Sequence, residues 1–178
     1  MKSFSIIALV MAAACGGGSG GGLGSSDPIT AAEAEPLCRG DCQRRVDCGS
    51  DSDVAACTTA CVGDIAGWAR GDGVEALLAC MAELACDAND DACILEVSVL
   101  AIHQEWEDRC RATMVTCFTE PGELDAACGV TAPVPSDAAF FRLIAPEIMT
   151  ELVACFDGAD CTTRIDCVGA ALEAHGIN

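Results

Sequence analysis

Fifteen cysteines in a chain of 178 residues constrain the fold of this protein more than any other feature of its sequence. Such a density is typical of exported proteins stabilised by disulfides, because cytosolic proteins keep their thiols reduced. An odd number of cysteines leaves one thiol without a partner in the same chain. Cys15 is the candidate for that odd cysteine, since it stands alone between alanines and glycines.

The first fourteen residues have the organisation of an export signal. Lys2 supplies a positive charge, the apolar stretch FSIIALVM follows at residues 4–11, and three alanines (12–14) precede Cys15. The apolar stretch is too short to remain as a membrane-spanning helix. The alanines satisfy the A-x-A rule of ordinary secretion, but they also resemble the lipobox of bacterial lipoproteins, which ends in a cysteine. Parity favours the lipoprotein interpretation, because a lipidated Cys15 leaves fourteen cysteines, an even number.

The resemblance to bacterial lipoproteins implies that residues 1–14 are a signal peptide and that Cys15 becomes the acylated first residue. Residues 15–30 then form a tether, whose richness in glycine and serine is typical of a flexible linker. Several acyl chains on one residue would hold the protein on a membrane. Gly16 at the next position resembles the version that Gram-negative bacteria sort to the outer membrane. The resemblance therefore implies an exported protein anchored by lipid to the outer membrane, on its periplasmic or cell-surface face.

The chain that follows the signal peptide is strongly acidic. Removing residues 1–14 removes the only lysine and leaves eight arginines against 28 acidic residues, a net charge of about −20. The absence of lysine excludes Schiff-base and P-loop lysine chemistry, and the negative charge repels nucleic acid. We expect no nucleic-acid partner, a membrane contact through the lipid anchor, and a protein partner in the cell envelope.

An internal repeat divides the rest of the chain. EALLACMAELACDANDDACI (residues 75–94) and TELVACFDGADCTTRIDCV (residues 150–168) share a constant offset of 75. The positions that match are Leu77, Leu78, Ala79, Cys80, Met81 and Cys86 with Leu152, Val153, Ala154, Cys155, Phe156 and Cys161, followed by Cys93 with Cys167 at an offset of 74. Upstream, Cys42, Cys48 and Cys57 correspond to Cys110, Cys117 and Cys128. We predict two related cysteine-rich modules, at residues 31–103 and 104–178.

The repeat also predicts disulfide pairs. Cys38 and Cys61 have no counterpart in the second module, so we pair them with each other. They are the outer members of the motifs CRGDC and CTTAC, in which two cysteines four residues apart share one helical face. Two such helices packed antiparallel can join outer to outer and inner to inner, which adds Cys42–Cys57. The spacing over residues 38–61 resembles that of α-hairpinin peptides, which implies a helical hairpin without implying their activities.

The remaining cysteines are paired by their places in an up-and-down helical arrangement. Cys48 follows the first predicted helix and Cys86 the third, at the same end of the module, so we pair them. The other expected pairs are Cys80–Cys93, Cys110–Cys128, Cys117–Cys161 and Cys155–Cys167. Other connectivities stay open at this stage, because six cysteines alone allow fifteen pairings.

The composition predicts an all-α, disulfide-rich fold. Alanine, leucine, glutamate and methionine dominate, and β-branched alternation is nearly absent. No glycine or proline occurs in residues 90–119, and we predict that ILEVSVLAIHQEWEDRCRATMVTCF (residues 94–118) is one long helix joining the two up-and-down modules. The other predicted helices cover residues 35–47 (entered at Pro36), a stretch from Ser52 or Asp53 to before residue 71, a stretch opened by Asp72 and Glu75, PGELDAAC, residues 137–156 with an interruption at Pro146, and Thr162–His175; TAPVPS is a predicted loop.

Redox and metal chemistry find little support in the sequence. No CxxC motif occurs, which disfavours thioredoxin-like catalysis. The two histidines of the expected mature chain, His103 and His175, are interpreted as solvated residues rather than as ligands. We expect no metal and no cofactor.

A calcium loop is only partly matched. Asp87, Asn89 and Asp91 stand at positions 1, 3 and 5 of such a loop, but Ala92 replaces the required glycine and Ser98 the closing glutamate. We interpret DANDD as a helix cap between two bridged cysteines.

No hydrolase signature such as GxSxG or HExxH is present. Trp68 and Trp106 are interpreted as core residues, the alternative being a tryptophan exposed on a partner-binding face. The sequence thus predicts a non-catalytic, outer-membrane-anchored binding or envelope-structural protein with an acidic helical surface. The alternatives are an extracytoplasmic inhibitor or defence protein built on disulfide-linked hairpins and, third, an enzyme of unrecognised type.

Overall fold

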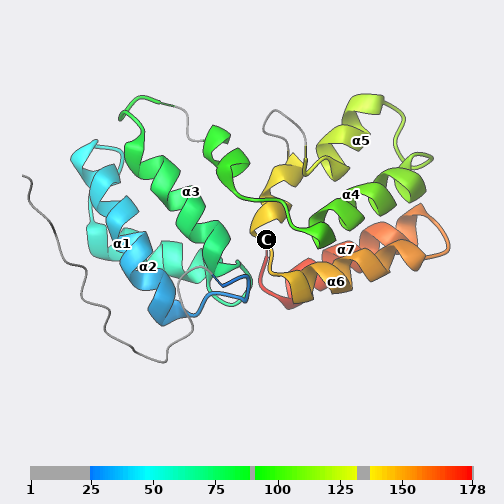
Figure 1. Ribbon diagram of the computed structural model, residues 1–178, viewed down its shortest axis with the longest axis horizontal. Helices are drawn as coiled ribbons and strands as arrows, with labels where there is room; N and C mark the ends of the chain where they lie inside the picture. The colour runs from blue at the N-terminus through cyan, green and yellow to red at the C-terminus, as the bar shows by residue number, and fades with distance from the viewer. Residues whose placement is uncertain (1–24, 89–90, 132–136, 178) are drawn as a thin grey trace, which may run out of the picture.

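The protein has an all-α, disulfide-rich fold, as predicted (Figure 1). The computed structural model describes residues 25–88, 91–131 and 137–177. The α-helices are α1 (Ala31–Asp47), α2 (Val54–Ile65), α3 (Gly71–Glu83), α4 (Ala101–Met114), α5 (Pro121–Cys128), α6 (Pro146–Ala154) and α7 (Cys161–Ala174). In the described ranges, three 3-10 helices accompany them: η1 (Asp91–Glu96), η2 (Asp137–Leu143) and η3 (Cys155–Asp157).

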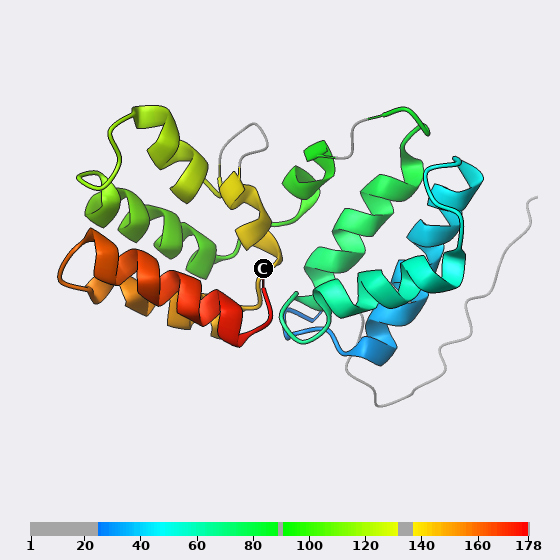
Figure 2. The same ribbon diagram turned by 180° about the vertical axis from the view of Figure 1, so that it is seen from behind.

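The helices gather into two groups, which Figures 1 and 2 show from opposite sides. In the first group α1 packs against α2 and α3. In the second group α4 packs against α5 and α6, and α6 packs against α7. The 3-10 helices η1 and η2 lie between the groups and contact each other. The predicted boundary between residues 103 and 104 falls inside α4.

Helix α1 begins four residues before the predicted start at residue 35. Thr30 and Glu33 form a capping box, in which the Thr30 Oγ1 accepts a hydrogen bond from the Glu33 amide and the Glu33 carboxylate accepts one from the Thr30 amide. This box satisfies two amides of the first turn and fixes the helix start. Pro36 therefore lies inside α1 rather than at its entrance.

The prediction of one long helix over residues 94–118 is wrong. The chain forms η1, continues without helical structure over residues 97–100, and then begins α4. The carbonyls of Leu95 and Ser98 accept hydrogen bonds from Arg142 and Arg70 instead of from amides along a helix. The His103 Nδ1 accepts from the Leu100 amide and so marks a new helix start. Side chains distant in sequence thus divide the stretch into two helices.

The helices α5 and α7 and the break before Pro146 agree with the prediction, and two other boundaries differ. α2 ends at Ile65, earlier than expected, and the chain then turns at Gly67, whose φ of 89° favours glycine. Arg70 occupies the N-cap of α3, so Asp72 does not cap this helix and forms an ion pair with Arg70 instead. Most of the predicted loop TAPVPS, residues 132–136, lies outside the described residues.

The two groups meet through a short antiparallel backbone pairing between residues 68–70 and 143–145. The Arg70 amide donates to the Leu143 carbonyl at 2.8 Å, and the Ala145 amide donates to the Trp68 carbonyl at 3.0 Å. The repeat offset of 75 maps each of these segments onto the other and exchanges the two hydrogen bonds. A reciprocal pairing of this kind is the signature of an approximate two-fold relation between the groups.

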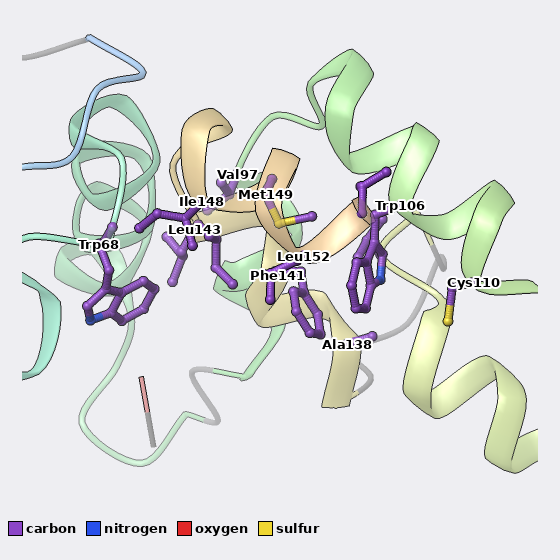
Figure 3. Close-up of a cluster of buried hydrophobic side chains, with 14 of the residues drawn as sticks. Trp68, Val97, Trp106, Cys110, Ala138, Phe141, Leu143, Ile148, Met149 and Leu152 are labelled. Carbon is purple, nitrogen blue, oxygen red and sulfur yellow. The ribbon is translucent and has the colours of Figure 1, made fainter. Parts of the chain in front are cut away.

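One hydrophobic core extends through both groups, from Trp68 to Trp106 (Figure 3). Both tryptophans are buried, which confirms their interpretation as core residues. The Trp106 ring stacks on Phe141 at a centroid distance of 4.4 Å and contacts Phe156 at 4.7 Å. The shared core means that neither group buries its apolar surface alone.

The end of the predicted tether belongs to the folded part. Ile29 is only 2% exposed, and its amide donates to the Ala69 carbonyl at 2.7 Å. Pro28 forms a backbone bridge with Arg70, and the Asp27 carbonyl accepts from the Gly71 amide. Residues 25–30 are thus packed against the start of α3, unlike a free linker. The predicted signal peptide, Cys15 and the rest of the tether lie outside the described residues.

Candidate functional site

All fourteen cysteines of the described residues form disulfides, in the same pairs that the repeat and the helical spacing predict. The pairs are Cys38–Cys61, Cys42–Cys57, Cys48–Cys86, Cys80–Cys93, Cys110–Cys128, Cys117–Cys161 and Cys155–Cys167. Oxidised cysteines provide neither a nucleophilic thiolate nor a thiolate metal ligand. Seven disulfides indicate an oxidising, extracytoplasmic location.

The bridges repeat between the two groups with one exception. In each group one bridge joins the first two helices, and one joins the chain just after the first helix to the chain after the third. The last bridge joins α3 to η1 in the first group and η3, which directly follows α6, to α7 in the second. Only the first group has an outer bridge, Cys38–Cys61. Trp106 stands four residues before Cys110, as Cys38 stands four residues before Cys42. In the second group a packed indole thus occupies the position of a bridged cysteine.

A cluster of buried ionisable side chains lies where the two groups meet. Arg70 is fully buried, and its guanidinium donates to the Ser98 carbonyl at 2.8 Å and to the Ser98 hydroxyl at 2.6 Å. Its Nε lies 3.1 Å from a carboxylate oxygen of Asp72. Burial lowers the pKa of Arg70, and the charge of Asp72 opposes this shift. The guanidinium therefore holds the segment before α4 against the start of α3.

His103 also belongs to this buried cluster, so its interpretation as a solvated residue is wrong. Its Nδ1 accepts from the Leu100 amide at 3.0 Å, and its Nε2 lies 3.2 Å from the Ile144 carbonyl. This geometry requires a neutral ring with its proton on Nε2. Burial is the main cause that lowers the pKa of His103 to about 4, and the charges of Arg70 and Arg142 add to it. With both nitrogens engaged, His103 has no lone pair left for a metal or a substrate.

Arg142 completes the cluster from η2. Its Nε donates to the Val130 carbonyl, and its Nη1 donates to the Leu95 carbonyl at 2.9 Å. Burial lowers the pKa of Arg142, while the carboxylate of Glu107 opposes the shift. The hydrogen bonds of Arg70, His103 and Arg142 fix the backbone at the junction. These contacts give the cluster a structural role.

The other sequence-derived candidates lie apart from this cluster. His175, at the end of α7, retains partial exposure, and its Nε2 lies 2.9 Å from a carboxylate oxygen of Glu151. Asp87 and Asp91 are exposed, and Asn89 lies outside the described residues. Within the ranges that the structure describes, no three His, Cys, Asp or Glu side chains gather into a group that could hold a metal ion.

A groove between α1 and α2 is the candidate binding site, and no sequence motif marked it. It has a volume of about 660 Å³, within the range of ligand-binding clefts. Small and β-branched side chains line most of it, together with one ion pair between Glu35 and Arg39. The lining residues are Ala31, Ala32, Glu35, Arg39, Val54, Ala55, Thr58, Thr59 and Val62. A second hollow beside it, of about 600 Å³, shares Glu35 and Arg39.

Comparison with known proteins adds no identity: no family model, no curated protein and no solved structure matches this chain. Among the described helices, none has both the length and the hydrophobicity needed to cross a bilayer.

Proposed function

We propose that this protein is a non-catalytic lipoprotein of the cell envelope, anchored to the outer membrane through Cys15, which presents its acidic helical body to a protein partner. The observation that carries this proposal is the use of the cysteines. Seven disulfides consume fourteen of them and leave Cys15 as the odd one, directly after a signal-like segment. An unpaired thiol in an oxidising compartment reacts or pairs with another chain, and acylation of Cys15 would prevent both.

The architecture supports a binding role over a catalytic one. The buried ionisable groups of the junction, Arg70, His103 and Arg142, are engaged with backbone groups. The α1/α2 groove is open and apolar, and its walls are joined by two disulfides. Rigid walls reduce the entropy lost on binding.

The doubly bridged hairpin supports a second candidate function, that of an extracytoplasmic inhibitor or defence protein. Cys38–Cys61 and Cys42–Cys57 give residues 38–61 the outer-to-outer and inner-to-inner pairing expected for an α-hairpinin-like spacing. Stoichiometric inhibition of proteases by the purified protein would favour this function.

The anchor is tested by expression in a Gram-negative host. The wild-type protein is expected in the detergent-extracted membrane fraction, with an acylated amino terminus at residue 15 in intact mass spectrometry. Reduction should add fourteen hydrogens to that mass, two for each disulfide. The matched control, Cys15→Ser, should be exported without acylation and remain in the soluble fraction. A water-soluble wild-type protein with an unmodified amino terminus would refute the anchor.

A further inference from the structure

The groove between α1 and α2 has the dimensions of a seat for a short helix. It extends from Ala31 to Arg39 along one helix and from Val54 to Val62 along the other. The first and last of nine helical residues are separated by a rise of about 12 Å, which corresponds to roughly two turns. The alanines and valines that line it leave room for another backbone to approach closely. Helix-in-groove recognition uses surfaces of this kind.

The equivalent surface in the second group is covered by the chain itself. Matching Cys42 to Cys110 places Glu35 at the position of His103 and Arg39 at that of Glu107. The side chains of Glu35 and Arg39 are 54% and 64% exposed, whereas His103 is fully buried.

Backbone and side-chain groups from outside α4 cover the face that carries His103 and Glu107. The His103 ring meets the Ile144 carbonyl, and Glu107 accepts hydrogen bonds from the amide and the hydroxyl of Thr131. Although burial alone would raise the pKa of Glu107, its hydrogen bonds with Thr131 and Arg111 lower it. In the second group, the segments that contain Thr131 and Ile144 thus cover the face of α4 that corresponds to the open face of α1.

The charge of the groove's surroundings selects the kind of segment. The hairpin from Ala31 to Ile65 carries seven acidic residues against three arginines, and the arginine in the groove, Arg39, is paired with Glu35. Exposed carboxylates stand at both ends of the α2 wall, since Asp53 precedes Val54 and Asp64 follows Val62. Such a surface attracts cations and repels acidic segments.

We propose that the α1/α2 groove binds a short amphipathic helix of a protein partner, with small apolar residues on the buried face and lysine or arginine on the exposed face. This inference rests on the proposed binding function and names its surface and the class of its partner. It does not depend on the lipid. If fractionation shows that the protein is not lipid-anchored, the proposed binding in the groove is unaffected.

The test uses the mature, disulfide-intact full chain and two synthetic helical peptides of about 12 residues, a length that covers the groove's two turns. Both peptides carry the same alanine and valine face, and their exposed faces carry four lysines in one and four glutamates in the other. Calorimetry should show saturable one-to-one binding of the lysine peptide only. Raising the salt from about 0.05 M to about 0.5 M should weaken this binding by screening the charges.

Substitutions locate the site. Ala32→Trp fills the groove and should weaken binding of the lysine peptide by about tenfold or more, while Ala170→Trp, on the exposed surface of α7, should leave it unchanged. Glu35→Lys reverses a charge beside the groove without adding bulk to the apolar wall, and it should also weaken binding of the lysine peptide. This variant keeps the test valid if Ala32→Trp disturbs folding. Failure of the lysine peptide to bind with a dissociation constant of about 1 mM or lower would overturn the proposal. Equal binding of both peptides, or binding that neither Ala32→Trp nor Glu35→Lys weakens, would overturn it as well.

Discussion

Trp106 is expected to be the most sensitive single position of the second group. It is 2% exposed and contacts two aromatic rings, Phe141 and Phe156. Truncation of a buried tryptophan to alanine typically costs about 3–5 kcal/mol, because apolar contacts are lost and a cavity remains. Each aromatic contact contributes about 0.5–1.5 kcal/mol of this cost. We therefore expect Trp106→Ala to lower the free energy of unfolding by about 4 kcal/mol.

Trp106→Phe is the matched control. The indole Nε1 is buried without a hydrogen-bond acceptor in the described part of the chain, so phenylalanine removes no hydrogen bond. It keeps an aromatic ring against Phe141, and we expect a loss of about 1 kcal/mol from reduced volume.

The assay is urea unfolding of the oxidised protein, followed by far-ultraviolet circular dichroism. The midpoints give the differences in stability if the slope with denaturant stays constant. Because one core spans both groups, each variant should unfold in a single transition rather than losing the second group first. A loss below about 1 kcal/mol for Trp106→Ala, or equal losses for the alanine and phenylalanine variants, would refute this account of the core.

Three further predictions concern other parts of the molecule. Thr30→Ala should destabilise the protein by about 1 kcal/mol in urea unfolding, because α1 loses its capping box; no change would contradict the role of the box. His103 has a pKa of about 4 in the folded protein and about 6.5 in the unfolded chain, so between these values the unfolded chain binds more protons. The free energy of unfolding should therefore fall by about 3 kcal/mol as the pH drops from 6.5 to 4. His103→Gln should remove this part of the pH dependence, measured as the difference from wild type over the same range, whereas identical curves would refute it. With limiting reductant and no denaturant, the Cys48–Cys86 disulfide should be reduced before Cys42–Cys57, because Cys86 is exposed whereas Cys42 is fully buried. Alkylation followed by mass mapping of the modified cysteines measures this order. The reverse order would show that exposure of the cysteines does not control the access of the reductant.

The disulfide pairs could be predicted because their determinants are local or repeated. CxxxC spacing places cysteines on one helical face, and the two modules limit each other's connectivity. The start of α1 was also readable, since Thr30 and Glu33 form a standard capping box, but the proline at position 36 drew the predicted start away from it. Local signals of this kind need no knowledge of the tertiary structure.

The break between η1 and α4 could not be predicted, because its causes lie far away in the sequence. Arg70 and Arg142 donate to carbonyls of residues 95–98 across separations of 28 and 47 residues. One feature of the sequence does indicate the burial of His103. Its position continues the three- and four-residue spacing of the buried residues Trp106, Cys110 and Met114 along α4. That stripe marks the face of the helix that is turned toward the core, where an ionisable residue becomes buried if its two nitrogens find partners. The groove left no such signal, because alanine and valine in a helix are equally consistent with a core.

The two halves of the molecule stabilise equivalent positions by different means. In the first group, Cys38–Cys61 closes a loop with a sequence separation of 23, around the inner bridge Cys42–Cys57. Chain-entropy arguments give such an outer bridge about 3 kcal/mol, and the inner bridge reduces this value because it already restricts the same loop. The packing of Trp106 at the equivalent position contributes about 3–5 kcal/mol through burial. The bridge stabilises the hairpin without covering α1, so the face next to it stays open as a groove. The Trp106 ring stacks on Phe141 of η2, while the Ile144 carbonyl and Thr131 cover the corresponding face of α4. A disulfide at this position thus accompanies an open face, and an aromatic ring accompanies a covered one.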